Sequence, residues 1–79
     1  MSNKTWTNID NALAKTFVFE DFVCALAFVQ SVGELAELAK HHPDITINYN
    51  KVHLRLQTHD AGNVITQKDL DLAEGIDRL

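Results

Sequence analysis

The sequence predicts an α+β fold, in which helices pack on one face of an antiparallel sheet. The main observation is that the hydrophobic period changes along the 79-residue chain. It runs from a strand-like period of two to helical spacing, then back to two, and then to helical spacing again. A second observation is the composition, 46% hydrophobic and 23% charged, which is ordinary for a globular chain. A chain of this length forms one domain, so we expect residues 1–79 to be a single unit.

The first strand is predicted over residues 13–19. Side chains alternate between two faces there, and several are aromatic or β-branched, which is typical of a strand. One face carries Leu13, Lys15, Phe17 and Phe19. The preceding segment, residues 4–11, is weakly patterned, with Trp6 and Ile9 as its apolar anchors.

A helix follows this strand. Asp21 is placed to cap its N-terminus. Pro43 disfavours helical geometry in the residue before it, so we expect the helix to end at about His41 or His42. We expect Cys24, near the start of the helix, to be a small core residue. The apolar residues recur at three-and-four spacing, as Phe22, Ala25, Leu26, Val29, Val32, Gly33 and Ala36.

Two further strands are predicted after Pro43, joined by a turn at Asn50-Lys51. This turn would place three pairs of apolar residues opposite one another on one face of a hairpin. The pairs are Tyr49 with Val52, Ile47 with Leu54, and Ile45 with Leu56.

The C-terminal segment combines a turn with a helix. Residues 60–63 have turn chemistry, and the run from Thr66 to Asp69 matches a capping box with Asp in place of Glu. The apolar side of the helix then carries Leu70, Leu72, Ala73, Ile76 and Leu79.

Composition argues against several classes of protein. Seven basic and 11 acidic side chains give a net charge of −4, whereas a general nucleic-acid binder is normally basic. The longest apolar run, residues 22–29, is short of the roughly 20 residues of a transmembrane helix. Residues 1–10 lack the apolar run of a secretory signal. A single cysteine, Cys24, cannot form an internal disulfide, so we expect a reducing, cytoplasmic location.

Three histidines are the main candidates for chemistry. Extending the predicted hairpin places His42 opposite His59, with β-carbons roughly 5 Å apart. Glu37 precedes His41 by one helical turn, where a carboxylate would favour the imidazolium form, as would the helix dipole. Asp60 and Asp69 lie near the same end of the domain. Histidine exchanges protons near neutral pH, so the cluster indicates an acid–base pocket.

Structural alternatives stay open at this point. Histidines at a helix end can bond the last carbonyls, and Asp69 can serve only as a helix cap. A zinc site ranks below an acid–base pocket, because adjacent His41 and His42 on a helix diverge by about 100°.

Several runs of the chain resemble the pterin-4a-carbinolamine dehydratase family, and together they cover most of its length. One piece alone is weakly specific, but the spaced combination of His-His-Pro, Tyr-Asn-Lys-Val and Thr-His-Asp is specific. The matching runs are ELAKHHPD at 37–44, YNKV at 49–52, THDAG at 58–62, Thr66, Asp69, and FVFEDF at 17–22.

The resemblance implies a four-stranded antiparallel sheet with helices packed on one face. It also implies a hydro-lyase activity: loss of water from 4a-hydroxytetrahydropterin to give the quinonoid dihydropterin, in tetrahydrobiopterin recycling. It implies no cofactor and no metal, a homodimer or homotetramer, and a pathway link to aromatic amino acid hydroxylases. Neither a nucleic acid nor a membrane is expected as a direct partner.

The resemblance also assigns roles to residues of this chain. His41, His42 and His59 would be catalytic, with His41 and His59 as candidate acids and His42 as a pterin ligand or base. Glu37 and Asp69 would orient the histidines. The residues that would border the pterin, besides the histidines, are Pro43, Thr58, Asp60 and Ala61.

Three departures from the family pattern are visible. The start of the chain leaves little room for the N-terminal helix that family members commonly have. Ile45 stands where an aromatic residue is common, and the loop at residues 60–65 is one residue longer than in some members, which could move Asp69. Because some members are partners of a transcription factor, a non-catalytic dimerisation or interaction module is the alternative function.

Overall fold

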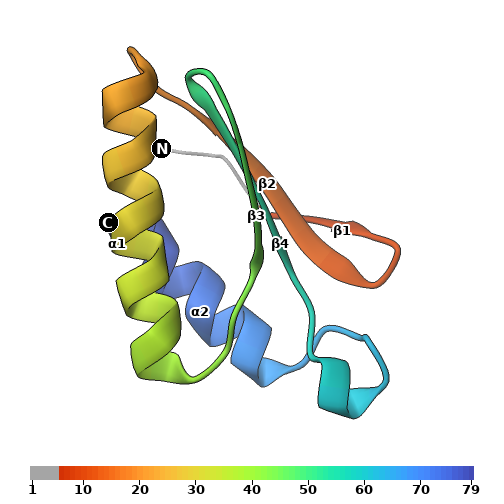
Figure 1. Ribbon diagram of the computed structural model, residues 1–79. Coiled ribbons are helices and arrows are strands. Elements are labelled where there is room, and N and C mark those ends of the chain that lie inside the picture. The colour runs from red at the N-terminus through yellow and green to blue at the C-terminus, as the bar shows by residue number, and fades with distance from the viewer. Residues whose placement is uncertain (1–5) are drawn as a thin grey trace.

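The computed structural model of the protein describes residues 6–79, so expectations that concern residues 1–5 lie outside the described part. It contains one four-stranded antiparallel sheet, with strand order β1-β2-β4-β3, and two α-helices on one face of it (Figure 1). The predicted α+β fold is thereby confirmed. The elements are β1 (Thr7–Ile9), β2 (Ala12–Val18), α1 (Phe22–Ala39), β3 (Asp44–Asn48), β4 (Lys51–Leu56), a 3₁₀ turn η1 (His59–Ala61) and α2 (Gln67–Asp77).

The first hairpin, β1–β2, lies in the segment that looked weakly patterned in the sequence. It turns at Asp10 and Asn11, whose φ angles are 54° and 62°. Two successive left-handed residues are what a tight hairpin turn requires, and Asp and Asn adopt this conformation more readily than most residues. The Asp-Asn pair was therefore an available turn signal.

Helix α1 begins as predicted and ends earlier than predicted. The Asp21 side chain accepts a hydrogen bond from the Cys24 backbone N–H at 2.9 Å, which confirms the N-cap. At the other end Lys40 turns left-handed, with φ 56°, and the His41 N–H donates to the Ala36 carbonyl at 3.1 Å. This is a Schellman-type ending. His41 and His42 consequently follow the helix instead of lying on it.

The face of α1 that packs on the sheet is narrower than the sequence suggested. Ala25, Val32 and Ala36 are buried, whereas Phe22 and Leu26 are 45% and 41% exposed. Cys24 is exposed, so the prediction of a core cysteine is wrong. The N-cap at Asp21 places Cys24 in the first turn of the helix, where it is exposed.

By length and composition alone, the 18-residue α1 is apolar enough to cross a membrane, a property that core helices of globular domains share. The prediction against such a segment counted only one uninterrupted apolar run and so understated the apolar length of this helix. Here α1 contributes Ala25 and Val32 to the same core as the sheet and α2, and we treat it as the core helix of the domain.

The β3–β4 hairpin has a different register from the predicted one. Ile45 pairs with Leu54 and Ile47 pairs with Val52, so the turn falls at residues 49 and 50. Asn50 fixes this turn by donating from its side chain to the Phe19 carbonyl at 2.9 Å. The predicted register is thus wrong by two residues. An even shift keeps every side chain on its predicted face, which is why the apolar face is still correct.

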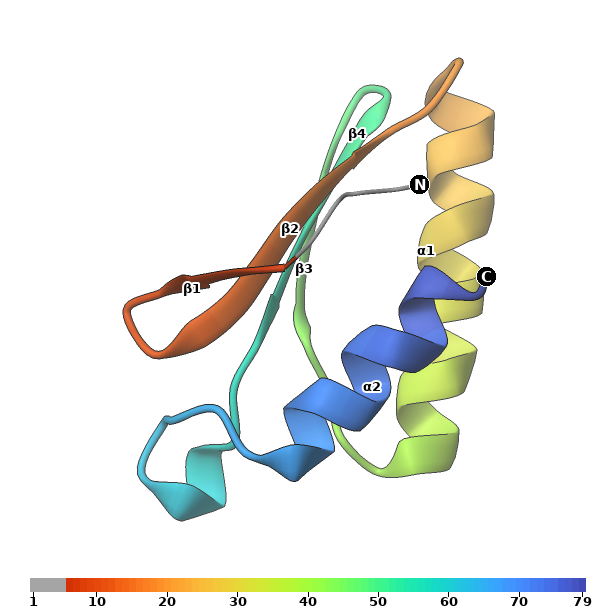
Figure 2. The same cartoon turned by 180° about the vertical axis from the view of Figure 1, so that it is seen from behind.

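The core lies between the sheet and the two helices, which share one face of the sheet in both views (Figures 1 and 2). The predicted capping box of α2 at Thr66 and Asp69 is present. Leu70 and Leu79, which were expected on the apolar side of α2, are exposed. The buried core residues are Leu13, Ala25, Val32, Val52, Leu54, Leu56, Leu72, Ala73 and Ile76.

Candidate active site

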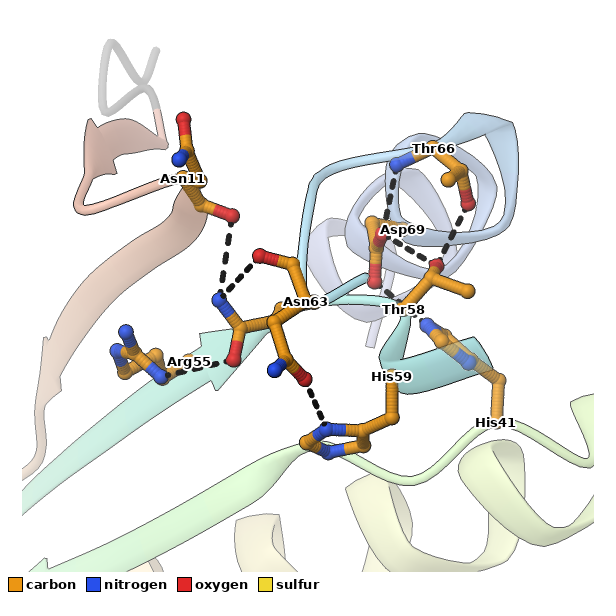
Figure 3. Close-up of polar contacts among 9 residues, drawn as sticks. Asn11, His41, Arg55, Thr58, His59, Asn63, Thr66 and Asp69 are labelled. Carbon is orange, nitrogen blue, oxygen red and sulfur yellow. Dashed lines mark hydrogen bonds and ion pairs between the residues drawn. The ribbon is translucent and has the colours of Figure 1, made fainter. Parts of the chain in front are cut away.

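The most buried part of the candidate site is a pair formed by His41 and Asp69. His41 lies just after α1, and Asp69 lies in the first turn of α2. The His41 Nε2 and Asp69 Oδ1 atoms are 2.5 Å apart (Figure 3). The side chain of Asp69 is fully buried and that of His41 is 11% exposed. The pair therefore joins the C-terminal end of one helix to the N-terminal end of the other.

The second oxygen of Asp69 is also fully engaged. Its Oδ2 accepts from the Thr58 hydroxyl at 2.8 Å and from the Thr66 backbone N–H at 2.8 Å. The hydroxyls of Thr58 and Thr66 are themselves 2.6 Å apart. Asp69 is therefore a helix cap and a histidine partner at the same time, so the structural reading of this residue and the functional reading are compatible.

This environment keeps Asp69 ionised. Burial by itself raises the pKa of Asp69, but the hydrogen bonds from His41, Thr66 and Thr58 together lower it more, so that the pKa lies below its ordinary value. An ionised carboxylate only accepts hydrogen bonds, so Nε2 of His41 carries a proton and donates it. Asp69 thereby fixes the ring orientation of His41 and leaves Nδ1 as its other exchangeable nitrogen.

His42 has a different partner and a different environment. Its Nε2 lies 2.9 Å from Oε1 of Glu37, and both side chains are more than half exposed. The sequence placed Glu37 beside His41, on the assumption that the helix continues. Because the left-handed Lys40 ends the helix first, the Glu37 carboxylate meets His42 instead.

His59 opens the 3₁₀ turn η1 and is held by a residue that the sequence analysis missed. Its Nδ1 lies 2.7 Å from the side-chain oxygen Oδ1 of Asn63 (Figure 3). An amide oxygen only accepts, so Nδ1 donates and Nε2 is the other exchangeable nitrogen. Asn63 has a φ of 60°, a conformation that Asn tolerates well. A lone Asn after a glycine in a long loop was the only signal in the sequence.

The loop that carries Asn63 is tied to the first hairpin. The Gln57 side-chain amide donates to the Asn63 carbonyl at 3.1 Å and to the Asn11 carbonyl at 3.3 Å. Arg55 donates in turn to the Gln57 side-chain oxygen at 3.4 Å. These contacts give the His59 loop a fixed position relative to the sheet (Figure 3).

The three histidines line one pocket of about 180 Å³. They do so by a different route from the predicted one, because continuing the observed register would place His42 opposite Gln57. The full lining is Lys40, His41, His42, Thr58, His59, Asp60 and Lys68. Neither lysine was singled out from the sequence.

A second hollow, of about 340 Å³, shares Thr58, Asp60 and Lys68 with the histidine pocket. Ala61 lines this second hollow, together with Thr66 and Gln67. Pro43 lines neither of the two. Among residues 6–79, no three His, Cys, Asp or Glu side chains are grouped so that they could hold a metal ion.

The arrangement is suited to proton transfer on a small polar molecule. Each imidazole has one nitrogen engaged by an oxygen acceptor, which leaves the other available to give or take a proton. The three histidines line one pocket, so a proton donor and a proton acceptor could act on the same ligand.

Comparison with known proteins agrees with the motifs. The family model described as pterin 4 alpha carbinolamine dehydratase matches residues 1–79. A protein from Thermomicrobium roseum is 54% identical over 74 residues, covering 94% of this chain and 78% of its own. One from a Picosynechococcus strain is 51% identical, covering 94% and 79%. Both are provisionally named pterin-4-alpha-carbinolamine dehydratases.

Solved structures share the fold. The crystal structure of a transcriptional coactivator/pterin dehydratase from Brucella melitensis has a TM-score of 0.88 at 31% identity, covering 95% of this chain and 81% of that one. A pterin dehydratase-like protein described as a RuBisCO assembly factor in the alpha-carboxysome has a TM-score of 0.80 at 22% identity, covering 96% and 89%. The second likeness concerns the fold alone. On the family match and the sequence identities, this chain belongs to the pterin-4-alpha-carbinolamine dehydratase family.

Proposed function

We propose that the protein dehydrates 4a-hydroxytetrahydropterin to the quinonoid dihydropterin in tetrahydrobiopterin recycling. The observation that carries this proposal is the convergence of His41, His42 and His59 on one pocket, with His41 held by a buried carboxylate. Family membership supports a pterin as the substrate. Loss of water from such a compound is an acid–base reaction, which is the chemistry that imidazoles perform near neutral pH.

The reaction breaks the bond from carbon 4a to its hydroxyl oxygen and forms a double bond between carbon 4a and nitrogen 5. The hydroxyl leaves as water once it receives a proton, and nitrogen 5 gives up its proton to a base. One proton is supplied and one is removed, so atoms and charge balance, and the reaction needs no redox cofactor. General acid–base catalysis of this kind is worth about 10²–10⁴-fold.

We assign the proton donor to His41 or His59, and the base or a direct pterin ligand to His42. Asp69 is a positioning residue for His41, and Glu37 is one for His42. Thr58, Asp60 and Ala61 would border the pterin, because they line the two adjoining hollows. Pro43 would act through the backbone, by favouring an extended conformation at His42.

A non-catalytic interaction module is the second candidate function. The observation that favours it is the exposure of apolar side chains on α1, where Phe22 is 45% and Val23 is 72% exposed. Such a face is suited to contact with a second protein or with a second copy of the chain. We propose a cytoplasmic homodimer or homotetramer, with a pathway link to an aromatic amino acid hydroxylase. This surface and the histidine pocket are separate, so the two functions can coexist.

Stopped-flow absorbance of freshly generated 4a-carbinolamine tests the catalytic proposal. The His59→Ala variant should lose at least about 10²-fold of the acceleration, because it removes a proposed acid. The His53→Ala variant is the matched control, since His53 is exposed and bonds to Thr16 on the strands, outside the pocket lining. Rates unchanged in alanine variants of all three pocket histidines would leave only the interaction function.

A further inference from the structure

The histidine pocket is too small to hold a typical ligand on its own. Its volume of about 180 Å³ lies below the roughly 300–1,000 Å³ of most small-molecule sites. The adjoining hollow, of about 340 Å³, brings the combined space into that range. Since Thr58, Asp60 and Lys68 line both spaces, a ligand whose ring lies beside the histidines can extend a side chain past these residues.

The charges around this combined space differ from those of the rest of the chain. The protein carries a net charge of −4 and has seven basic residues, of which Lys40 and Lys68 line the histidine pocket. Three other basic residues, Lys15, Arg55 and Arg78, are paired with carboxylates. Neither Lys40 nor Lys68 makes an ion pair with any residue in the described range 6–79.

The carboxylates near these lysines are mostly engaged. Asp69 is bonded to His41, and Glu37 is bonded to His42. Asp60 is the one acidic side chain in the lining of either hollow, so it opposes an anion there. The lining of the histidine pocket itself therefore contains two ammonium groups and one carboxylate, and the carboxylates of Asp69 and Glu37 are hydrogen-bonded to His41 and His42.

We propose that the pterin substrate carries an anionic side chain, a phosphate ester or a carboxylate, which extends into the second hollow and is bound by Lys68. This inference rests on the proposed function and narrows its substrate class. Lys68 is suited to the contact because it lines both spaces. A lysine ammonium has three donors, and its flexible stem lets it follow an anion of either geometry. Lys40 lines only the histidine pocket and adds attraction at longer range.

A matched set of substrates tests this inference. The 4a-carbinolamines of 6-hydroxymethyl-tetrahydropterin, of its phosphate monoester and of tetrahydropterin-6-carboxylate differ in side-chain charge, and each would be followed by stopped-flow absorbance. We expect kcat/KM to be about tenfold higher for at least one anion than for the neutral compound, the size of a charge-assisted contact. The better anion identifies the side chain. The preference should shrink as salt is raised from 20 to 500 mM, because exposed charges are screened.

Three variants connect the preference to the pocket. Lys68→Gln should make kcat/KM equal for anionic and neutral substrates, and Asp60→Asn should increase the preference for the anionic ones. Lys51→Gln is the control, because Lys51 is exposed at the start of β4 and lines neither hollow. Equal kcat/KM for all three substrates, or a ratio that survives Lys68→Gln, would overturn the inference while dehydration itself stands.

A binding measurement separates this inference from the catalytic proposal. The stable 7,8-dihydropterins that correspond to the neutral and phosphorylated compounds would be titrated calorimetrically. Tighter binding of the phosphorylated form, lost in Lys68→Gln, supports the anion contact even if no carbinolamine is turned over. Equal affinities for the two forms contradict it.

Discussion

The three pocket histidines fall into two groups that are held in different ways. His41 is nearly buried and bonds to Asp69, whose two oxygens accept three hydrogen bonds in all. His42 and His59 are exposed, and each bonds to one exposed side chain, Glu37 and Asn63 respectively. His41 is therefore part of a buried hydrogen-bond network, whereas His42 and His59 are held by contacts at the surface.

This difference indicates how stability and activity are distributed over the site. The Asp69 network joins the residues after α1, the start of η1 and the first turn of α2, so disturbing it should affect both folding and chemistry. His42 and His59 each bond to one solvent-exposed side chain, so disturbing these contacts should affect chemistry more than folding.

The largest effect is expected for Asp69→Asn. A side-chain amide cannot accept hydrogen bonds on both sides, so it leaves at least one of the His41, Thr58 and Thr66 donors facing a donor. We expect a loss of about 3–5 kcal/mol in the free energy of unfolding, typical of breaking a buried charged network. Thermal and urea unfolding would measure it. Asp71→Asn, on the exposed side of the same helix, should stay within about 0.5 kcal/mol.

The same carboxylate gives stability a pH dependence. The pKa of Asp69 in the folded state is lowered, so its contribution is present above the unfolded pKa of about 3.9 and is lost as pH falls through the lower folded value. The difference in unfolding free energy between the wild type and Asp69→Asn should therefore shrink as pH falls below about 4. A difference that stays constant down to pH 2 would mean that Asp69 is not held ionised by its partners.

An intermediate effect is expected for Thr58→Val. This variant removes one donor to Asp69 and the partner of the Thr66 hydroxyl while it keeps the side-chain shape. We expect a loss of about 1–3 kcal/mol on urea unfolding, because a charge-assisted hydrogen bond is lost in a buried site. Thr58→Ser, which keeps the hydroxyl, should recover most of the loss. Equal destabilisation by both variants would mean that packing, and not the hydrogen bond, is responsible.

Asn63→Ala should separate activity from stability. It releases Nδ1 of His59 without touching the core, so we expect the unfolding free energy to fall by only about 1 kcal/mol, the cost of placing alanine in the left-handed conformation of residue 63. The loss of one orienting hydrogen bond, about 1 kcal/mol, predicts a roughly fivefold lower kcat and a shifted pH–rate profile. An unchanged profile together with a wild-type kcat would show that Asn63 does not position His59.

The smallest effect is expected for Glu37→Gln. Both members of the Glu37–His42 pair are solvated, so the pair contributes less than about 1 kcal/mol. Dehydration rates should fall less than about threefold, and 0.5 M salt should remove the difference from wild type. A tenfold loss would place His42 in the same rigid group as His41.

The same contrast explains how much the sequence could predict. Local signals were read correctly: Asp21 caps α1, and Thr66 with Asp69 forms the capping box. These features depend on residues three apart in the chain. The apolar face of the hairpin was also correct, because alternation survives an even shift of register.

The predictions from the sequence were wrong where a tertiary contact or a rare backbone conformation determines the structure. The hairpin turn is fixed by the Asn50 side chain reaching Phe19, which no local pattern encodes. Glu37 bonds to His42 and not to His41, because Lys40 adopts a left-handed conformation and ends the helix. Lysine has no special preference for this conformation. Lys68 lines the pocket because the fold brings the start of α2 next to η1, which the sequence pattern did not predict. By contrast, the turn at Asp10-Asn11 could have been predicted from the Asp-Asn pair, but it was not.

A crystal structure with bound 7,8-dihydrobiopterin would show whether His41, His42 and His59 form one pterin pocket. We expect the bicyclic ring in the space lined by these histidines, with Thr58 and Asp60 at its edge. A ring bound elsewhere, such as in the hollow lined by His53 and Arg55 on the strands, would contradict this expectation.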